Sequence, residues 1–196
     1  SDLLETFQGA GEPILRVLYE DADLLVVEKP AGMASHPSGG HYRDTLANLV
    51  QSYLLKKGEA CRIRPVGRLD RETSGIMVFA KNQAAAARLG EQRKNGAFHK
   101  TYTALAVGEL PAGSRGCIRQ PIGPDPEDRL RMRVDDGGKP AVTHWEVEAS
   151  GGGLSLLRLT LETGRTHQIR VHMAWLGCPL AGDSLYGGAL EKEIGR

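Results

Sequence analysis

The stretch VGRLDRETSGIMVFAKN, residues 66–82, places one Asp among charged neighbours directly ahead of an apolar run. Asp70 stands between Arg68 and Arg71, and a Thr-Ser-Gly turn follows it. The run GIMVFAK, residues 75–81, has the β-branched and aromatic residues that favour a buried strand. An Asp flanked by Arg is ordinarily a loop residue in a surface ion pair, which contributes about 0–1 kcal/mol. Two interpretations of Asp70 therefore stand side by side, a structural ion pair and a functional acid.

Two strands and a helix are predicted ahead of this stretch. ILRVLYE (14–20) and LLVVEKP (24–30) are rich in Leu and β-branched residues, and a short acidic turn separates them. Apolar residues between positions 46 and 54 recur at helical spacing, which predicts a helix that a glycine ends. Either Asp44 or Thr45 can cap the start of this helix.

The second half of the chain predicts strands around an irregular excursion. Strands are expected within FHKTYTALAVGEL (98–110), THWEVEA (143–149) and LSLLRLTLE (154–162). Residues 111–140 are rich in Pro, Gly, Asp and Arg, which predicts a loop or a hairpin there.

Two further helices complete the predicted fold. Asn82 caps the first helix, and Gly96 ends it. THQIRVHMAWLG (166–177) switches to helical spacing, with Thr166 as its N-cap and Gly177 directly after its end. Several paired strands, three helices and few β-α-β alternations favour an α+β fold, with a largely antiparallel mixed β-sheet flanked by helices and loops.

Length and composition exclude several classes of protein. The 196 residues suit one domain, and 40% apolar residues are enough for a packed core. No apolar run approaches the ~20 residues of a membrane span. The N-terminal sequence is acidic and lacks a basic start and an apolar stretch, so no secretion signal is expected. Three cysteines without a CxxC motif argue against a disulfide framework and a zinc ribbon, so a reducing cytoplasm is the expected compartment.

The positive charge of the chain is concentrated in one segment. Residues 62–100, the basic segment, hold nine Lys or Arg against three acids, a net +6, which leaves −5 for the rest of a chain of net +1. Such asymmetry either marks a face for a polyanion such as RNA or belongs to a solvated helix face.

Other residues are of types found in hydrolase or metal sites, but the sequence around them does not support such roles. Ser74 lacks the G-x-S-x-G elbow of a serine hydrolase. His167 and His172 are five apart, so they miss the i, i+4 spacing of two metal ligands on one helix face. No glycine-rich nucleotide motif occurs, so neither a cofactor nor a metal is expected. Arg165 lies at a helix start, where the dipole disfavours a cation, so it either faces an anion or pairs with Glu162.

Three segments in order resemble the RluA-type pseudouridine synthases: VGRLDRETSGIMVFAKN, HKTYTALAVGEL and ETGRTHQIRVHMAWLGCPLAGDSLYGG. VVEKPAGMASHP (26–37) resembles a fourth signature of this family, and the resemblance covers residues 15–188. It implies the catalytic fold of these synthases. It also implies isomerisation of selected uridines in RNA to pseudouridine without a cofactor.

The resemblance implies a role for several residues. Asp70 matches the essential catalytic Asp of the family, and Arg170, in QIR, matches the Arg that pairs with it. Tyr102, in K-x-Y, matches the Tyr that packs on the target base. Arg68 matches an Arg that helps to displace or replace the flipped base, and Leu180 matches an aliphatic residue that lines the uracil pocket.

Lys100 and Arg165 are the expected phosphate contacts. Lys100 precedes Tyr102 by two residues, so on a strand both side chains share one face. One departure from the family pattern is Gly67, which stands where many relatives carry a His before Arg-Leu-Asp.

We expect one catalytic domain over residues 1–196, without the N-terminal RNA-binding appendage and the C-terminal strands of relatives. The expected partner is RNA, with ribosomal large-subunit RNA favoured over tRNA, and the chain is expected to be a monomer with no membrane association. Two alternatives stay open. One is a catalytically impaired RNA-binding protein of this fold, and the other is a hydrolase that uses Ser74 or Asp70.

Overall fold

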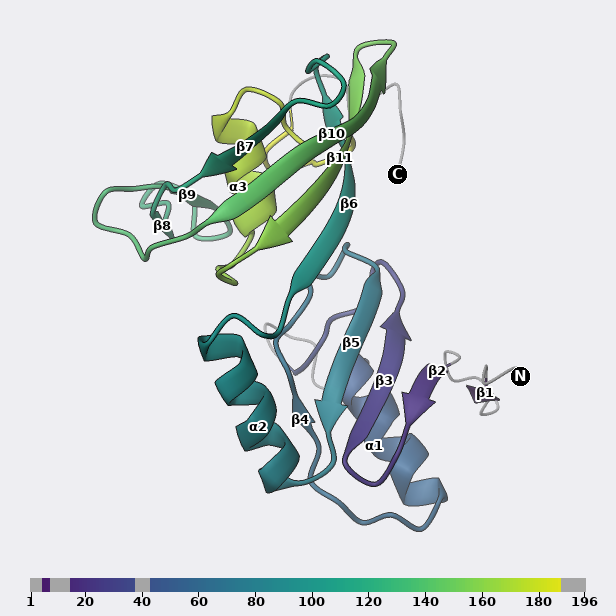
Figure 1. Cartoon of the computed structure of the whole chain (residues 1–196). Helices are drawn as coiled ribbons and strands as arrows, with labels where there is room; N and C mark the ends of the chain where they lie inside the picture. The colour runs from purple at the N-terminus through teal and green to yellow at the C-terminus, as the bar shows by residue number, and fades with distance from the viewer. Residues whose placement is uncertain (1–4, 8–14, 38–42, 188–196) are drawn as a thin grey trace. The chain divides into compact units, whose positions relative to one another are not determined.

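The computed structural model of the chain describes residues 5–7, 15–37 and 43–187 (Figure 1). The chain divides into two compact units, Ser1–Phe98 and His99–Arg196, and each unit has its own sheet and its own core. That the whole chain acts as one catalytic domain stays a prediction.

The first unit is built on a five-stranded sheet in the order β1-β2-β3-β5-β4, with every neighbouring pair antiparallel. Its elements are β1 (Glu5–Phe7), β2 (Leu15–Glu20), β3 (Leu24–Lys29), α1 (Leu46–Lys56), β4 (Arg64–Pro65), β5 (Gly75–Ala80) and α2 (Gln83–Lys94). The predicted strands at 14–20, 24–30 and 75–81 and both predicted helices are therefore confirmed.

The core of this unit lies between β3, β5 and α1. Val27 pairs with Met77 and Leu25 with Phe79, and all four side chains are buried. Leu46, Val50 and Leu54 of α1 belong to the same apolar cluster. The apolar run after Asp70 is therefore a central strand, which fixes one end of the loop that carries the acid.

Side-chain caps set the helix starts. Thr45 caps α1, because its hydroxyl accepts from the Asn48 amide while Asn48 Oδ1 accepts from the Thr45 amide. Of the two predicted caps, the structure thus uses Thr45. Asn82 Oδ1 accepts from the Ala85 amide at 2.9 Å, which confirms the predicted cap of α2.

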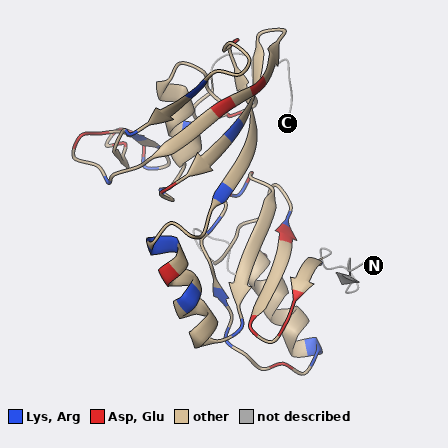
Figure 2. Ribbon diagram, in the orientation of Figure 1, with Lys and Arg blue, Asp and Glu red and all other residues tan. Residues whose placement is uncertain are grey.

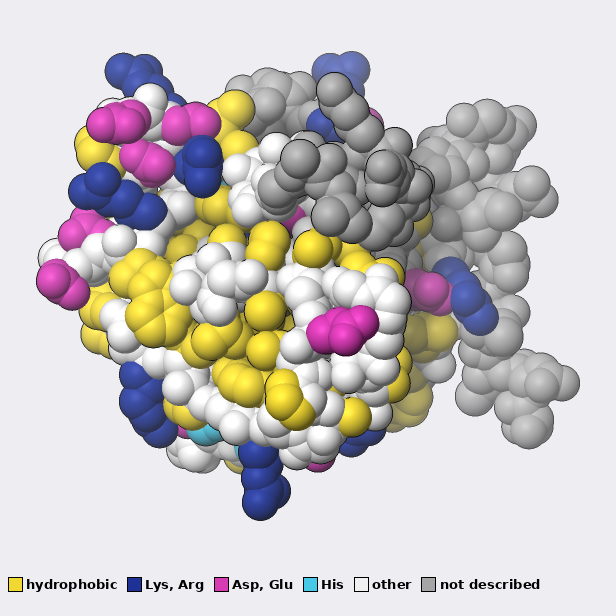
Figure 3. All heavy atoms as spheres, turned by 90° about the horizontal axis from the view of Figure 1, so that it is seen from above, with side chains coloured by type: hydrophobic (Ala, Val, Ile, Leu, Met, Phe, Trp, Pro, Cys, Tyr) yellow, Lys and Arg dark blue, Asp and Glu magenta, His cyan; other side chains and the backbone are white. Residues whose placement is uncertain are grey.

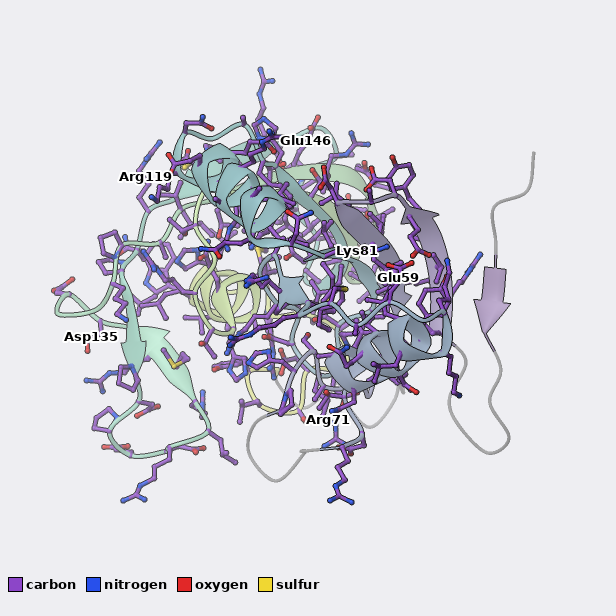
Figure 4. The ribbon with its side chains drawn as sticks, turned by 90° about the horizontal axis from the view of Figure 1, so that it is seen from below. Glu59, Arg71, Lys81, Arg119, Asp135 and Glu146 are labelled. Atoms are coloured by element: carbon purple, nitrogen blue, oxygen red, sulfur yellow. The ribbon has the colours of Figure 1, made fainter. Side chains whose placement is uncertain are left out.

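An ionic cluster around the buried Lys81 lies at the end of β5 away from Asp70. Lys81 Nζ lies 2.6 Å from Glu59 Oε2 and 3.0 Å from Glu20 Oε1 (Figure 4). Burial alone would raise the pKa of Glu20, but hydrogen bonds from Tyr53, Lys57 and Lys81 lower it below its ordinary value. The cluster ties β2, β5 and the segment after α1 together.

The second unit contains a four-stranded antiparallel sheet in the order β6-β11-β10-β7 and a separate hairpin, β8-β9. Its elements are β6 (Lys100–Val107), β7 (Arg115–Ile118), β8 (Ile122–Pro124), β9 (Met132–Val134), β10 (Thr143–Gly151), β11 (Leu154–Leu161) and α3 (Gln168–Trp175). The α+β class and the antiparallel sheet are confirmed.

The excursion at 111–140 contains more structure than the sequence predicts. The hairpin is β8-β9, as expected, but β7 also joins the main sheet beside β10. Gly116 permits this pairing, because a Cβ there would lie 2.6 Å from the indole of Trp145. A four-residue strand containing Gly gives little sequence signal.

The predicted N-cap of the last helix is wrong. The helix begins at Gln168, and the N-cap residue is His167, in the left-handed conformation with φ 56° and no side-chain cap bond. The start is held instead by the buried Gln168 side chain, which accepts from the Arg165 amide and donates to the Val142 carbonyl. Gly177 follows the helix with φ 83°, as predicted.

Among the described residues, no helix is long and apolar enough to cross a membrane. Figure 3 shows hydrophobic side chains gathered on the face seen from above, with Lys and Arg mostly at its margin. Large exposed apolar side chains in the described residues of the second unit include Leu105, Leu130 and Trp175.

Candidate active site

Asp70 lies in the loop between β4 and β5, and its neighbours on both sides are bound by the segment that follows β3. Ser35 Oγ donates to the Leu69 carbonyl at 2.6 Å and accepts from the Leu69 amide at 3.1 Å. The Gly32 amide donates to the Arg71 carbonyl at 2.9 Å. The backbone before and after the half-buried Asp70 is thus held at two points.

The hydrogen bonds that hold the backbone on both sides of Asp70 form a brace, and the Arg71 side chain contributes to it. Its Nε donates to the Gly32 carbonyl at 2.9 Å, so Gly32 and Arg71 exchange two hydrogen bonds. Its ion pair with Glu72, at 3.8 Å, is exposed and adds little. Arg71 therefore holds the loop of the acid as well as balancing charge.

Lys29 is a functional candidate that the sequence reasoning missed. The residue is 0% exposed, and its Nζ donates to the carbonyls of Pro30 at 2.8 Å, Met33 at 2.7 Å and Arg71 at 2.8 Å. Burial lowers the pKa of Lys29 to about 8, against the opposing effect of the Glu72 and Asp70 carboxylates. The only sequence signal was the place of Lys29 in VVEKPAGMASHP.

The backbone conformation explains why a glycine occupies position 67. Its φ is +88°, in the left-handed region that favours glycine. The residue that departs from the family pattern therefore lies where the backbone turns ahead of Arg68. Arg68 itself is exposed.

Arg170 projects from α3 into an ion pair that the sequence reasoning did not predict. Its Nε lies 2.7 Å from Asp183 Oδ2 and its Nη2 2.8 Å from Asp183 Oδ1. Asp183 is 0% exposed and also accepts from the amides of Leu185 and Tyr186. Burial would raise the pKa of Asp183, but Arg170 and the two amides lower it. The charged pair is thereby fixed in one bidentate geometry.

Tyr186 supports the same guanidinium. Its ring lies 4.9 Å from Arg170 Cζ and 5.4 Å from Arg131 Cζ, distances typical of cation–π contacts. Its hydroxyl accepts from the Met132 amide at 2.8 Å and lies 2.7 Å from His167 Nδ1. The β8-β9 hairpin and the strained start of α3 thus meet at Tyr186.

The other predicted residues of the second unit lie on β6 and near α3. Lys100 and Tyr102 share the inner face of β6, and Tyr102 packs against the core of this unit, as does Leu180. Leu180 also forms a β-bridge to Ala106. These positions agree with the predicted alternation of β6.

Arg165 does not pair with Glu162. Its Nε donates to the Pro140 carbonyl at 2.9 Å, and Glu162 Oε1 lies 2.6 Å from His144 Nε2 instead. His172 is 0% exposed, and both of its ring nitrogens are engaged, by Thr143 Oγ1 and the Gln120 carbonyl. His172 therefore has a structural polar role.

The predicted site residues fall into two groups. Asp70 and Arg68 belong to the first unit, and Lys100, Tyr102, Arg165, Arg170 and Leu180 belong to the second. Their convergence on one substrate, and the pairing of Arg170 with Asp70, stay predictions.

The comparisons with known proteins identify the family to which this antiparallel α+β chain belongs. The model of the RNA pseudouridylate synthase family matches residues 23–175. The chain belongs to this family.

Individual relatives support the assignment. The chain is 51% identical over 176 residues to the uncharacterized RNA pseudouridine synthase YhcT of Bacillus subtilis, covering 89% of this chain and 58% of that protein. It is 45% identical over 181 residues to the ribosomal large subunit pseudouridine synthase D of Xanthomonas campestris, covering 92% of this chain and 54% of that one. The chain thus spans little more than half the length of these two relatives.

A solved structure shows the same fold. Human RNA pseudouridylate synthase domain containing 1 superposes with a TM-score of 0.73 at 29% identity, covering 93% of this chain and 73% of that chain.

Proposed function

We propose that this chain isomerises specific uridines in RNA to pseudouridine, with Asp70 as its catalytic carboxylate and without a cofactor. The observation that carries the proposal is the brace around Asp70, in which Ser35, Gly32 and Lys29 fix the residues on either side of it. Large-subunit ribosomal RNA is the favoured substrate, because a relative named for it is 45% identical; tRNA is the alternative. We expect the protein to act as a cytoplasmic monomer.

The chemistry needs no redox step. The C1′–N1 bond breaks, the uracil turns, and C1′ joins C5. The C5 hydrogen leaves as a proton and N1 takes up a proton, so substrate and product are isomers. An ionised Asp70 can act in two ways: it can add to uracil C6, or it can attack or deprotonate at the ribose. The acid must therefore carry its charge inside a site from which the base excludes water.

Arg170 is the proposed partner that keeps Asp70 ionised. Asp183 accepts hydrogen bonds from Nε and Nη2 of Arg170, which fixes the orientation of the guanidinium. The remaining N–H groups of Arg170 point away from Asp183. A guanidinium within hydrogen-bonding distance favours the charged form of an acid. In this scheme Asp183 and Tyr186 position Arg170, and Arg170 serves Asp70.

The remaining residues bind the substrate. A uridine in folded RNA must be flipped out, which costs a few kcal/mol, and stacking on an aromatic ring returns about 1–3 kcal/mol. Tyr102 is the proposed ring, Leu180 lines the uracil pocket, and Arg68 fills the space that the base leaves. Lys100 and Arg165 contact phosphates.

Release of tritium from RNA labelled at uridine C5 tests the function. Wild-type protein should release tritium from large-subunit ribosomal RNA, and Asp70→Asn should bind the same RNA without release. Binding without release by the wild type would favour the alternative of a catalytically impaired RNA-binding protein.

A further inference from the structure

The guanidinium of Arg131, a half-buried residue directly ahead of β9, has a donor without an acceptor. Its Nε is buried, and no atom of the described residues accepts a hydrogen bond from it. Arg131 also forms no ion pair with any residue in the described part of the chain. Because a charged donor that is buried without an acceptor costs stability, this side chain is a candidate for binding a ligand.

The backbone on both sides of this guanidinium is held in place. The Arg131 amide donates to the Asp128 carbonyl at 3.0 Å, and the Arg131 carbonyl accepts from the Asp125 amide at 3.0 Å. The next amide, that of Met132, donates to the Tyr186 hydroxyl at 2.8 Å. Met132 begins β9, which contacts α3 (Figure 1). A ligand of Arg131 would therefore meet a backbone that is already ordered, which lowers the entropic cost of binding.

The two cations at the Tyr186 ring differ in their counter-charges. The ring lies 5.4 Å from Arg131 Cζ and 4.9 Å from Arg170 Cζ, so two guanidiniums lie close to one aromatic ring. Asp183 neutralises Arg170 through two hydrogen bonds, whereas Arg131 has no carboxylate partner among the described residues. The ring attracts a cation but carries no charge that could neutralise it. The ligand that this arrangement favours is an anion.

The nearest acids in the sequence are directed toward the backbone of their own turn. Asp125 Oδ1 accepts from the Glu127 amide at 3.1 Å, and Asp128 Oδ1 accepts from the Leu130 amide at 2.9 Å. These short-range bonds stabilise the turn between β8 and β9. They leave the guanidinium of Arg131 without a counter-charge from its own hairpin.

We propose that Arg131 binds a backbone phosphate of the RNA substrate, at the target nucleotide or at its immediate neighbour. A guanidinium suits this ligand, because its planar N–H groups match two phosphate oxygens. Arg170, at the same aromatic ring, is the proposed partner of the catalytic carboxylate, so a phosphate on Arg131 lies close to the reacting uridine. This inference rests on the proposed function and adds a substrate-binding residue to it.

Arg115 offers a matched control in the same unit. It is an exposed Arg of β7 that also forms no ion pair with a described residue. Strand alternation places it on the sheet face opposite the buried Ile118, which shares a core cluster with Met173 of α3. Arg115→Gln thus removes the same charge from a different face, so an effect of net charge alone should appear in both variants.

The experiment measures the binding of transcripts of large-subunit ribosomal RNA over a range of salt concentrations for wild type, Arg131→Gln and Arg115→Gln. We expect Arg131→Gln to bind on the order of tenfold more weakly at low salt, as for the loss of a charged hydrogen bond. The slope of log K against log salt should fall by about one, and Arg115→Gln should keep the wild-type slope. A wild-type slope in Arg131→Gln, or an equal loss in both variants, would overturn the proposal.

A second variant keeps the test valid if Arg131→Gln folds poorly. Arg131→Lys keeps the charge but not the planar fork, so it should retain the wild-type salt slope with reduced affinity. Thermal unfolding gives an independent readout. Since Arg131 has no counter-charge in the described residues, Arg131→Gln should melt close to the wild-type temperature. A large loss of stability together with an unchanged salt slope in Arg131→Lys and Arg131→Gln would show a structural role instead.

Neutral linkages locate the phosphate. In a short RNA that the wild type binds, methylphosphonates replace single phosphates beside the target uridine, each compared with a matched 2′-deoxy control. Wild type should lose affinity at one linkage, and Arg131→Gln should lose little more there, because the contact is already absent. Equal losses for the two proteins at every linkage would contradict the assignment.

Binding and tritium release separate failure of this inference from failure of the proposed function. A wild type that binds RNA through Arg131 but releases no tritium would keep the phosphate contact and remove the isomerase. A wild type that releases tritium, with Arg131→Gln binding as tightly and with the same salt slope, would remove the contact and keep the isomerase.

Discussion

Asp183 is the residue on which the orientation of Arg170 depends. The pair is bidentate and largely buried, with side-chain exposures of 17% for Arg170 and 0% for Asp183. Asp183→Asn should lower the free energy of unfolding by about 3–5 kcal/mol, because a buried guanidinium loses its counter-charge. Urea denaturation measures this, and tritium release by the folded fraction should fall as well.

A surface pair provides the control for Asp183. Arg158 and Glu148 form an ion pair with an exposed Arg, so Glu148→Gln should change stability by less than about 1 kcal/mol. Since the pKa of Asp183 is lowered in the fold, its stabilisation is present above the unfolded value of 3.8 and is lost as the pH falls through the folded value. An Asp183→Asn effect that did not shrink in acid would contradict this assignment.

The contribution of Lys29 to stability should also rise with pH, but in the alkaline range. Its folded pKa of about 8 lies below the ordinary 10.5, so between these values the unfolded chain holds a proton that the native chain has released. The unfolding free energy of wild type relative to Lys29→Met should therefore rise by roughly 3 kcal/mol from pH 7 to above 10.5.

At this scale the sequence identified Asp70 and Arg170 as candidates, but not the residues that hold them. The Lys29 contact spans 42 positions and that of Arg170 spans 13, and both end in groups that no local pattern marks. A carbonyl acceptor has no side-chain signature. The left-handed conformation of His167 has no sequence signal either, and its ring contacts Tyr186, which lies 19 positions later in the chain.

At the scale of elements, Gly116 decides whether β7 can pair with β10. A Cβ at this position would lie 2.6 Å from Trp145, so Gly116→Ala should destabilise the unit by about 1–3 kcal/mol through forced movement of the ring. Thermal unfolding followed by tryptophan fluorescence measures the effect.

Gly151→Ala is the matched substitution, because nothing lies within 4 Å of a Cβ there. It should leave stability unchanged or slightly raised, since Ala restricts the unfolded chain. Equal changes in stability for Gly116→Ala and Gly151→Ala would mean that the Trp145 ring moves aside at no cost in free energy.

Regular elements could be predicted well where side-chain periodicity dominates. β5 and α1 follow their apolar patterns, and Thr45 and Asn82 cap as expected. β7 and the start of α3 escaped prediction for a physical reason. A glycine made room for an indole in the first, and a buried Gln side chain replaced the usual N-cap in the second.

At the scale of the whole molecule, the positive charge of the basic segment is expected to attract the RNA phosphates. It includes the Asp70 loop, α2 and the start of β6, and Figure 2 shows Lys and Arg along α2. Lys and Arg that contact phosphates release counterions, so RNA affinity should fall steeply with salt. The charge asymmetry was visible in the sequence; its placement on α2 and on the loop of Asp70 required the structure.

The resemblance of four short motifs predicted the family and its fold, and the family model matches residues 23–175. The proposed pairing joins Asp70 of the first unit to Arg170 of the second, so neither unit alone would contain the complete site. It is the central claim, because an acid buried under a pyrimidine requires a nearby cation to stay ionised.

A crystal structure of the protein with its RNA substrate tests that claim most directly, through the distance between the Asp70 carboxylate and the Arg170 guanidinium. We expect a nitrogen–oxygen separation of about 2.7–3.2 Å beside a flipped uridine that stacks on Tyr102. Asp70 and Arg170 in separate surroundings, with no base between Asp70 and Tyr102, would contradict it.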